Sequence, residues 1–341
     1  MYNRPEMKWQ HPILLILLFL SMVSCMPSVS VASPQTGIKV TATTGPTQDS
    51  STEVPSTLAL PAPTITQPAS EDRPTASITP TGTISTPDST ILPLLGPNEW
   101  QSLPVIPQVS PTVREIFAQG LSLGNNPNTF SKVGDCGSTP AWFLGDFDRG
   151  PRFYSLGEHT GLEGVIQAFQ GSYGRTSLAA KSGFNASSVF SLLWADRTQC
   201  NANETPLACE YRVHKPAFAF ITLGSNDVYH QDTFEQQMRA IIEFSIEQGV
   251  VPIVSTKADN LEGDGSLNAT IAQLAREYDV PLWNYWLAVQ PLPDFGLQED
   301  QVHLTWGPNQ FDDPQAMKSA WATRNLTALQ TLDAVWRFIS Q

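Results

Sequence analysis

Apolar positions beyond residue 110 follow two alternating patterns. Apolar residues three or four apart predict helices, and these cover Thr112–Leu123, Ser187–Trp194, Thr233–Gln248, Leu267–Tyr278 and Ala320–Ile339. Short apolar runs bounded by turn residues predict strands, at Asn128–Asp135, Ala217–Leu223, Val250–Ser255 and Val280–Tyr285. Strands that alternate with helices favour an α/β fold with a mainly parallel sheet between helical layers.

The N-terminus has the pattern of an export signal. Arg4 and Lys8 precede the apolar run Pro12–Val23. As a helix this run would span about 18 Å, which is too short for a hydrocarbon core of about 30 Å. Residues 1–25 therefore read as a signal peptide. Met22-Val23-Ser24-Cys25 resembles a bacterial lipobox, which predicts lipidation at Cys25 and an extracytoplasmic, lipid-anchored protein; the alternative is a secreted protein that loses Cys25 with its signal.

A second region differs in composition from the rest of the chain. Of the 28 prolines, 17 lie within residues 1–111, and no Phe, Tyr or Trp occurs between Pro27 and Glu99. Such a segment cannot bury enough apolar surface to offset its conformational entropy. We expect residues 26–98 to form a disordered Ser/Thr/Pro-rich tether and residues 99–341 to form the folded domain.

Charge and cysteine content narrow the choice of partners and compartment. The formal net charge of −13 argues against a nucleic-acid partner, because phosphate binding needs clustered Lys and Arg. Cys200 and Cys209 flank a short polar segment, which suits a local disulfide in an oxidising compartment. Cys136 is then left over. The histidines are scattered without ligand spacing and Gly-rich phosphate loops are absent, so we expect no metal and no cofactor.

Four polar blocks follow predicted strands or precede a helix. They are Gly134-Asp135-Cys136, Lys181-Ser182-Gly183-Phe184-Asn185, Gly224-Ser225-Asn226-Asp227 and Asp300-Gln301-Val302-His303. Each block alone is made of common turn residues. Parallel α/β folds, however, carry their chemistry at the carboxyl ends of the strands. The joint occurrence of the four blocks therefore predicts a functional site.

In this order the blocks resemble those of the SGNH (GDSL-type) hydrolase family, over roughly residues 128–310. The resemblance implies a three-layer α/β/α fold with a flavodoxin-like sheet. It also implies that Cys136 is the nucleophile, that His303 is the base and that Asp300 orients the imidazole. The oxyanion hole would comprise the backbone N–H groups of Cys136 and Gly183 and the side-chain amide of Asn226. Cys136 departs from the family pattern, because it stands where the family has serine.

The substitution leaves three functions open. The leading one is an esterase that removes ester or O-acetyl groups, with envelope or extracellular carbohydrate as the substrate class by analogy. The second is a catalytically degenerate protein that binds a glycan or another envelope component. The third is a thiol protease or amidase. We interpret Asp135 and Asp227 as residues that stabilise their turns. We expect Trp142 and Phe143 to pack in the core; the alternative is that they form a wall of a substrate cleft.

Overall fold

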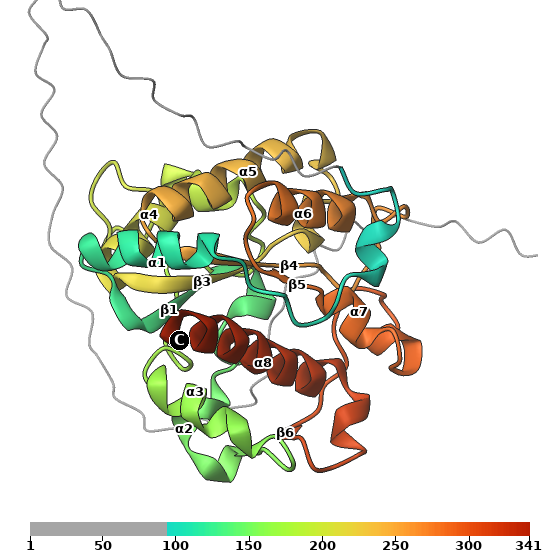
Figure 1. The fold of residues 1–341 in the computed structure, drawn as a ribbon. Coiled ribbons are helices and arrows are strands. Elements are labelled where there is room, and N and C mark those ends of the chain that lie inside the picture. Colours follow the sequence, from blue (N-terminus) through green and yellow to red (C-terminus); the bar gives the residue numbers. More distant parts are fainter. Residues whose placement is uncertain (1–93) are drawn as a thin grey trace, which may run out of the picture. The chain divides into compact units, whose positions relative to one another are not determined.

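The computed structural model describes residues 94–341 (Figure 1). The predicted signal peptide, the Cys25 lipidation site and most of the predicted tether lie outside the described residues. Residues 94–98, which the tether prediction includes, lie within them, and the Leu95 backbone N–H donates to Gln273 Oε1 at 2.9 Å. Within the described part of the chain, no helix combines the length and the apolarity needed to cross a membrane.

The centre of the molecule is a parallel sheet with the strand order β1-β3-β4-β5. Its strands are β1 (Asn126–Gly134), β3 (Pro216–Thr222), β4 (Val251–Ser255) and β5 (Leu282–Trp283). All residues of β3 and β4 are buried, which explains why their sequences are continuous apolar runs instead of alternating ones. β2 (Tyr154–Ser155) and β6 (Asn309–Gln310) form a separate two-stranded parallel sheet.

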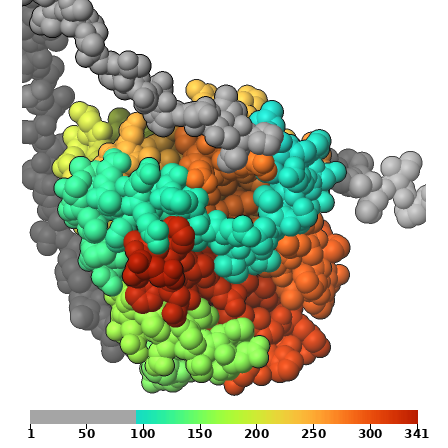
Figure 2. All heavy atoms as spheres, viewed as in Figure 1, coloured from blue at the N-terminus to red at the C-terminus, as the bar shows by residue number. Residues whose placement is uncertain are grey.

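Helices cover both faces of the central sheet (Figure 1). One layer contains α4 (Pro206–His214), α5 (Gln231–Glu247) and α6 (Ser266–Glu277). The other contains α1 (Thr112–Ser122), α3 (Glu163–Ala168) and α8 (Ala320–Ser340). Two further helices, α2 (Asp146–Arg149) and α7 (Tyr285–Val289), lie in connections. The end of α8 reaches the surface between α1 and the α2–α3 region (Figure 2).

Aromatic side chains fill the space between the sheet and the α8 layer. Phe218 on β3 contacts Phe117 of α1 and Phe169, with ring centroids 5.6 and 5.4 Å apart. Phe220, two residues further along, contacts Phe143 and Trp283. Residues two apart on a strand point to the same face, so the even-numbered positions of β3 face this layer.

The predicted three-layer α/β/α fold is confirmed, and two of its elements differ from the prediction. Ser187–Trp194 forms two short 3-10 turns (Ser188–Phe190 and Leu192–Trp194) instead of one helix, because Ser191 between them has an extended backbone with φ = −83° and ψ = 118°. The last strand is only Leu282–Trp283, because the Asn284 side chain accepts from Leu287 N–H and so begins α7.

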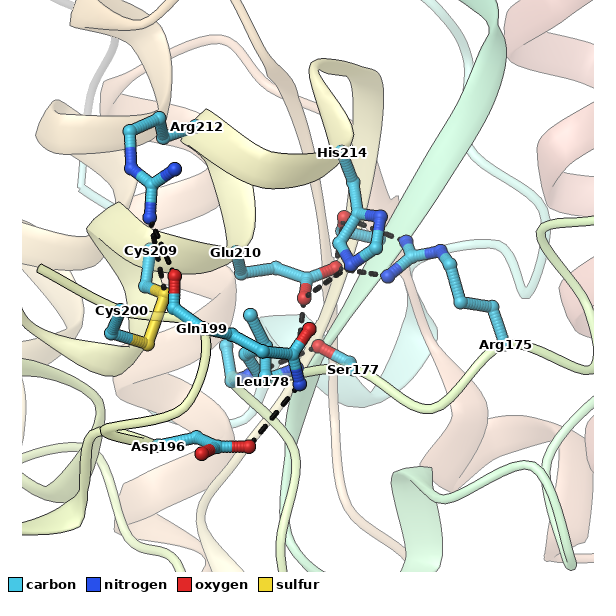
Figure 3. Close-up of polar contacts among 12 residues, drawn as sticks. Arg175, Ser177, Leu178, Asp196, Gln199, Cys200, Cys209, Glu210, Arg212 and His214 are labelled. Carbon is cyan, nitrogen blue, oxygen red and sulfur yellow. Dashed lines mark hydrogen bonds and ion pairs between the residues drawn. A yellow bond between two sulfur atoms is a disulfide. The ribbon is translucent and has the colours of Figure 1, made fainter.

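The predicted disulfide between Cys200 and Cys209 is present. It lies beside a buried ionic network centred on Glu210 of α4 (Figure 3). The carboxylate of Glu210 accepts from Arg175 Nη1 at 2.6 Å, from the Ser131 hydroxyl at 2.6 Å and from the Leu178 backbone N–H at 2.8 Å. The network therefore connects α4, β1 and the segment that leads to the predicted Gly183 block.

Candidate active site

A cavity of about 580 Å³ lies at the carboxyl edge of the sheet. All the residues predicted for catalysis line it, namely Cys136, Gly183, Asn226, Asp300 and His303. They come from four segments that span more than 160 positions of the sequence. The structure thus brings the four predicted blocks together, while their chemical roles stay predictions.

The Cys136 block is a tight turn at the end of β1. Cys136 begins a 3-10 turn, and Asp135 Oδ1 caps this turn by accepting from Gly137 N–H at 2.8 Å. A Cβ on Gly134 would lie 2.1 Å from Ser138 Oγ, so only glycine allows the turn to fold back over the strand. The Ser138 and Thr222 hydroxyls lie 2.5 Å apart, which joins the turn to the end of β3.

Burial raises the pKa of the Asp135 carboxyl, and the nearby Arg324 guanidinium and the Gly137 N–H oppose this rise. The contacts of Asp135 agree with the interpretation that it stabilises its turn.

Gly183 reaches the cavity because the preceding residues pair with β1. Gly134 N–H donates to Ala179 O and Lys181 N–H donates to Gly134 O, each at 3.1 Å. Gly183 has φ = +80°, a left-handed conformation that favours glycine. The pairing of Ala180 with Gly134 therefore fixes the position of the Gly183 backbone next to the Cys136 turn.

Asn226 follows β3 on a short 3-10 turn (Ser225–Asp227). Its Nδ2 donates to Phe184 O at 2.9 Å. An amide nitrogen carries two hydrogens, so this bond orients the group and leaves a second donor. Asp227 is buried and Oδ1 accepts from Ala186 N–H at 2.9 Å, which ties the same two blocks together; burial raises the pKa of this carboxyl.

Asp300 and His303, predicted as the orienting acid and the base, are in direct contact. His303 Nδ1 lies 2.5 Å from Asp300 Oδ2, and Asp300 Oδ1 accepts from the backbone N–H groups of Val302 and His303 at 3.0 and 2.9 Å. Burial on its own would raise the pKa of Asp300, but the hydrogen bonds from His303 and Val302 outweigh it and lower the pKa to about 2. Asp300 is therefore an anion at neutral pH that orients the imidazole.

Arg324 of α8 also lines the cavity, and the sequence analysis missed it. Its side chain is buried, with Nη1 donating to Gly137 O at 2.5 Å. Burial lowers the pKa of this guanidinium, while the charges of Tyr285, Asp135 and Cys136 oppose that lowering. A buried cation thus lies within electrostatic range of the predicted nucleophile.

A second missed group follows β4. Lys257 is buried, and its Nζ donates to Asp259 Oδ1 at 2.7 Å and to Glu262 Oε2 at 2.5 Å. Asp259 Oδ2 in turn accepts from the Ser225 hydroxyl at 2.5 Å. Lys257, Asp259 and Ser225 line the cavity. Lys257 and Asp259 follow β4 at the carboxyl edge of the sheet, so they obey the same strand-end rule as the predicted blocks, but they belong to no motif that would single them out.

The mouth of the cavity carries exposed tryptophans. Trp142 is 40% exposed and Trp306 is 69% exposed. Trp142 stacks on Trp321, with ring centroids 5.5 Å apart, and all three line the cavity. Trp142 therefore does not pack in the core as expected. Its ring covers Trp321 and leaves its other surface open to the cavity and solvent.

One group within residues 94–341 has the spacing of a metal site, namely Cys200, Glu204 and Cys209. Its two sulfur atoms are joined in the disulfide, so they are not thiolate ligands.

The fold and the cavity together define an α/β/α protein whose polar groups converge at the carboxyl edge of a parallel sheet. No family model and no curated protein matches the chain. Among solved structures the chain is similar to a GDSL-like lipase from Bacteroides thetaiotaomicron, with 15% sequence identity and a TM-score of 0.38. The similarity covers 65% of this chain and 97% of that chain.

Proposed function

We propose that the protein is a hydrolase that cleaves ester or O-acetyl groups with Cys136 as nucleophile. The observation that carries the proposal is that five residues chosen from four separate sequence blocks line one cavity. The Asp300–His303 pair inside it adds the orienting hydrogen bond that a general base needs. Random turn residues would not be expected to converge in this way.

The geometry of His303 determines which nitrogen acts. Asp300 accepts the Nδ1 proton, so the Nε2 lone pair is available as the base. Cys136 Sγ attacks the ester carbonyl carbon, and its proton moves to His303 Nε2. The carbonyl π electrons move to oxygen, where the N–H groups of Cys136 and Gly183 and the second amide hydrogen of Asn226 stabilise the negative charge.

The intermediate then collapses and expels the alcohol. The C–O bond of the ester breaks, and the leaving alkoxide takes the proton from His303 Nε2. Water, deprotonated by His303 Nε2, attacks the carbonyl carbon of the thioester that remains. The C–S bond then breaks, the Cys136 sulfur takes the proton back from His303, and the carboxylic acid is released. The enzyme returns to its starting state.

We further propose that the domain works outside the cytoplasm, attached to the membrane through a lipid on Cys25.

The exposed Trp142 and Trp306 at the cavity mouth support a carbohydrate ester as substrate, because flat aromatic faces can cover the apolar face of a sugar ring. Of the other candidates, the non-catalytic glycan-binding protein would use the same tryptophans.

The test is hydrolysis of p-nitrophenyl acetate and of acetylated xylan by the purified full chain. Activity that is lost in Cys136→Ala and in His303→Ala supports the proposal. His159→Ala is the matched control, because His159 lies outside the cavity and should leave activity unchanged. Cys136→Ser should retain or gain esterase activity if the other groups are in place.

One combination of results would overturn the proposed hydrolase function. A chain that hydrolyses neither substrate, and whose Cys136→Ser variant is also silent, overturns the proposal. If that chain still binds the acetylated glycan, the binding function replaces the hydrolase.

A further inference from the structure

Arg324 is a buried cation that forms no ion pair with a carboxylate of the described residues. Its side chain is 7% exposed, and its Nε is buried without a hydrogen-bond partner. Burying an arginine without an ion pair raises the free energy of the folded state, unless another group stabilises the positive charge. The surroundings of Arg324 should therefore supply an anion or a substitute for one.

Aromatic rings supply part of the compensation. The guanidinium carbon lies 4.6 Å from the centre of the Phe143 ring, 5.2 Å from that of Trp321 and 5.6 Å from that of Tyr285. Such contacts stabilise a cation through the ring quadrupoles. They also hold the guanidinium in place, because the three rings come from separate parts of the chain.

One nitrogen of the guanidinium contacts the Cys136 turn. Nη1 donates to Gly137 O, the carbonyl of the residue that follows Cys136. A Cβ placed on Gly137 would lie 3.1 Å from both Arg324 Nη1 and Asp135 Oδ1. Glycine at position 137 therefore allows the cation to approach the turn closely.

Asp135 is not a sufficient counter-ion. Its Oδ1 is used as the cap of the turn, accepting from Gly137 N–H. Burial raises the pKa of Asp135, so its charged form is itself destabilised at this position. Tyr285 is a second acidic group near Arg324, but burial raises the pKa of its hydroxyl, so it carries no charge at neutral pH. Cys136 is the third acidic group whose charge interacts with Arg324, and it also lines the cavity.

We propose that Arg324 is a positioning residue that keeps Cys136 in the thiolate form before substrate binds. The inference rests on the proposed function only in treating Cys136 as the nucleophile. The thiol proton passes to His303 Nε2, from which the leaving alkoxide later takes it, and no bond to carbon forms or breaks in this step. The thiolate compensates the buried guanidinium, and the guanidinium in turn raises the fraction of reactive sulfur at neutral pH.

The test is the pH dependence of Cys136 alkylation by iodoacetamide, read by mass spectrometry of the Cys136 peptide from the full chain. An unperturbed cysteine has a pKa near 8.5, and a neighbouring arginine cation lowers this pKa, typically to about 3.5–7.5. The wild-type midpoint should therefore lie well below 8.5. In Arg324→Met, which removes the charge but keeps the length of the side chain, the midpoint should rise by about one to three units.

Two variants separate a charge effect from a structural one. Arg324→Lys should keep most of the low midpoint, because it restores a cation. Arg337→Met is the matched control: Arg337 is an exposed arginine on the same helix, paired with Asp333, and its loss changes the net charge equally. It should leave the midpoint unchanged.

The outcomes distinguish this inference from the proposed function. If Arg324→Met does not fold, the wild-type chain alone tests the inference. An alkylation midpoint of Cys136 at or above pH 8.5 in the wild-type chain overturns it. An unchanged midpoint in a folded Arg324→Met also overturns it, even when esterase activity is present. A low midpoint that rises in Arg324→Met supports the inference, even when no ester is hydrolysed.

Discussion

Replacing Glu210 with glutamine should destabilise the domain far more than the same change at Glu204. The Glu210 side chain is fully buried and accepts from Arg175, Ser131 and Leu178 (Figure 3). Glutamine offers only one acceptor oxygen. If that oxygen keeps the bonds to Arg175 and Ser131, the amide N–H₂ group must face the Leu178 N–H, and a buried donor loses its acceptor.

The size of the effect follows from burial. Removing one partner of a buried ion pair costs about 3–5 kcal/mol. Arg175 is 18% exposed and can recover part of its hydration, so we take the lower end, about 3 kcal/mol. For a domain of this size, that corresponds to a drop in Tm of about 6–12 °C. Glu204 pairs with Arg212, which is 42% exposed, so Glu204→Gln should cost less than about 1 kcal/mol.

Urea unfolding followed by tryptophan fluorescence measures both variants under the same conditions. The Glu210 network also holds Leu178, which precedes the residues that pair with Gly134 and lead to Gly183. Glu210→Gln should therefore lower activity as well as stability. Equal losses of stability in the two variants, or a loss below about 1 kcal/mol in Glu210→Gln, would refute the argument that burial controls the strength of these pairs.

Three other substitutions test separate features. Asp300→Asn should lower kcat about 10⁴-fold by misplacing the His303 tautomer, whereas an unchanged kcat in an ester-hydrolysis assay would remove Asp300 from the mechanism. Gly183→Ala should cost about 1–2 kcal/mol in unfolding experiments, because φ is +80°; no measurable cost would contradict the strained backbone. Burial lowers the pKa of Lys132 from 10.5 to about 7. Between pH 7 and 10.5 Lys132 then binds more protons in the unfolded state than in the folded state, so the free energy of unfolding should rise with pH in this window. Lys132→Met should remove this part of the rise, measured by urea titrations at a series of pH values.

Much of the site could be predicted because its residues follow strands directly. Cys136 and Asn226 lie within four residues of the ends of β1 and β3, and parallel strands end at a common edge. Lys257 and Asp259 obey the same rule after β4 but belong to no recognised motif, so the pattern gave no reason to single them out.

Arg324 could not be predicted from local sequence. It is one charged residue within a helix whose other positions are mostly buried, and nothing nearby in the sequence indicates what surrounds it. Its burial depends on Phe143 and Tyr285, from segments about 180 and 40 positions away, that meet only in the folded chain. The position of Trp142 could not be predicted for the same reason. An aromatic residue after a turn can pack in the core or line a cavity, and for Trp142 the outcome depends on its contact with Trp321 of α8, which is far away in the sequence.

Cysteine and serine place different demands on the same cavity. A serine hydroxyl must lose its proton during attack, so it depends on a base at the moment of reaction. A thiol with a pKa near 8.5 can be ionised beforehand by a fixed nearby cation. The cavity holds both devices, the Asp300–His303 pair and the buried Arg324. A protein that only bound a glycan would need neither a base oriented by a carboxylate nor a cation buried beside a thiol. Their presence in one cavity is therefore the structural reason to favour acyl transfer over simple binding.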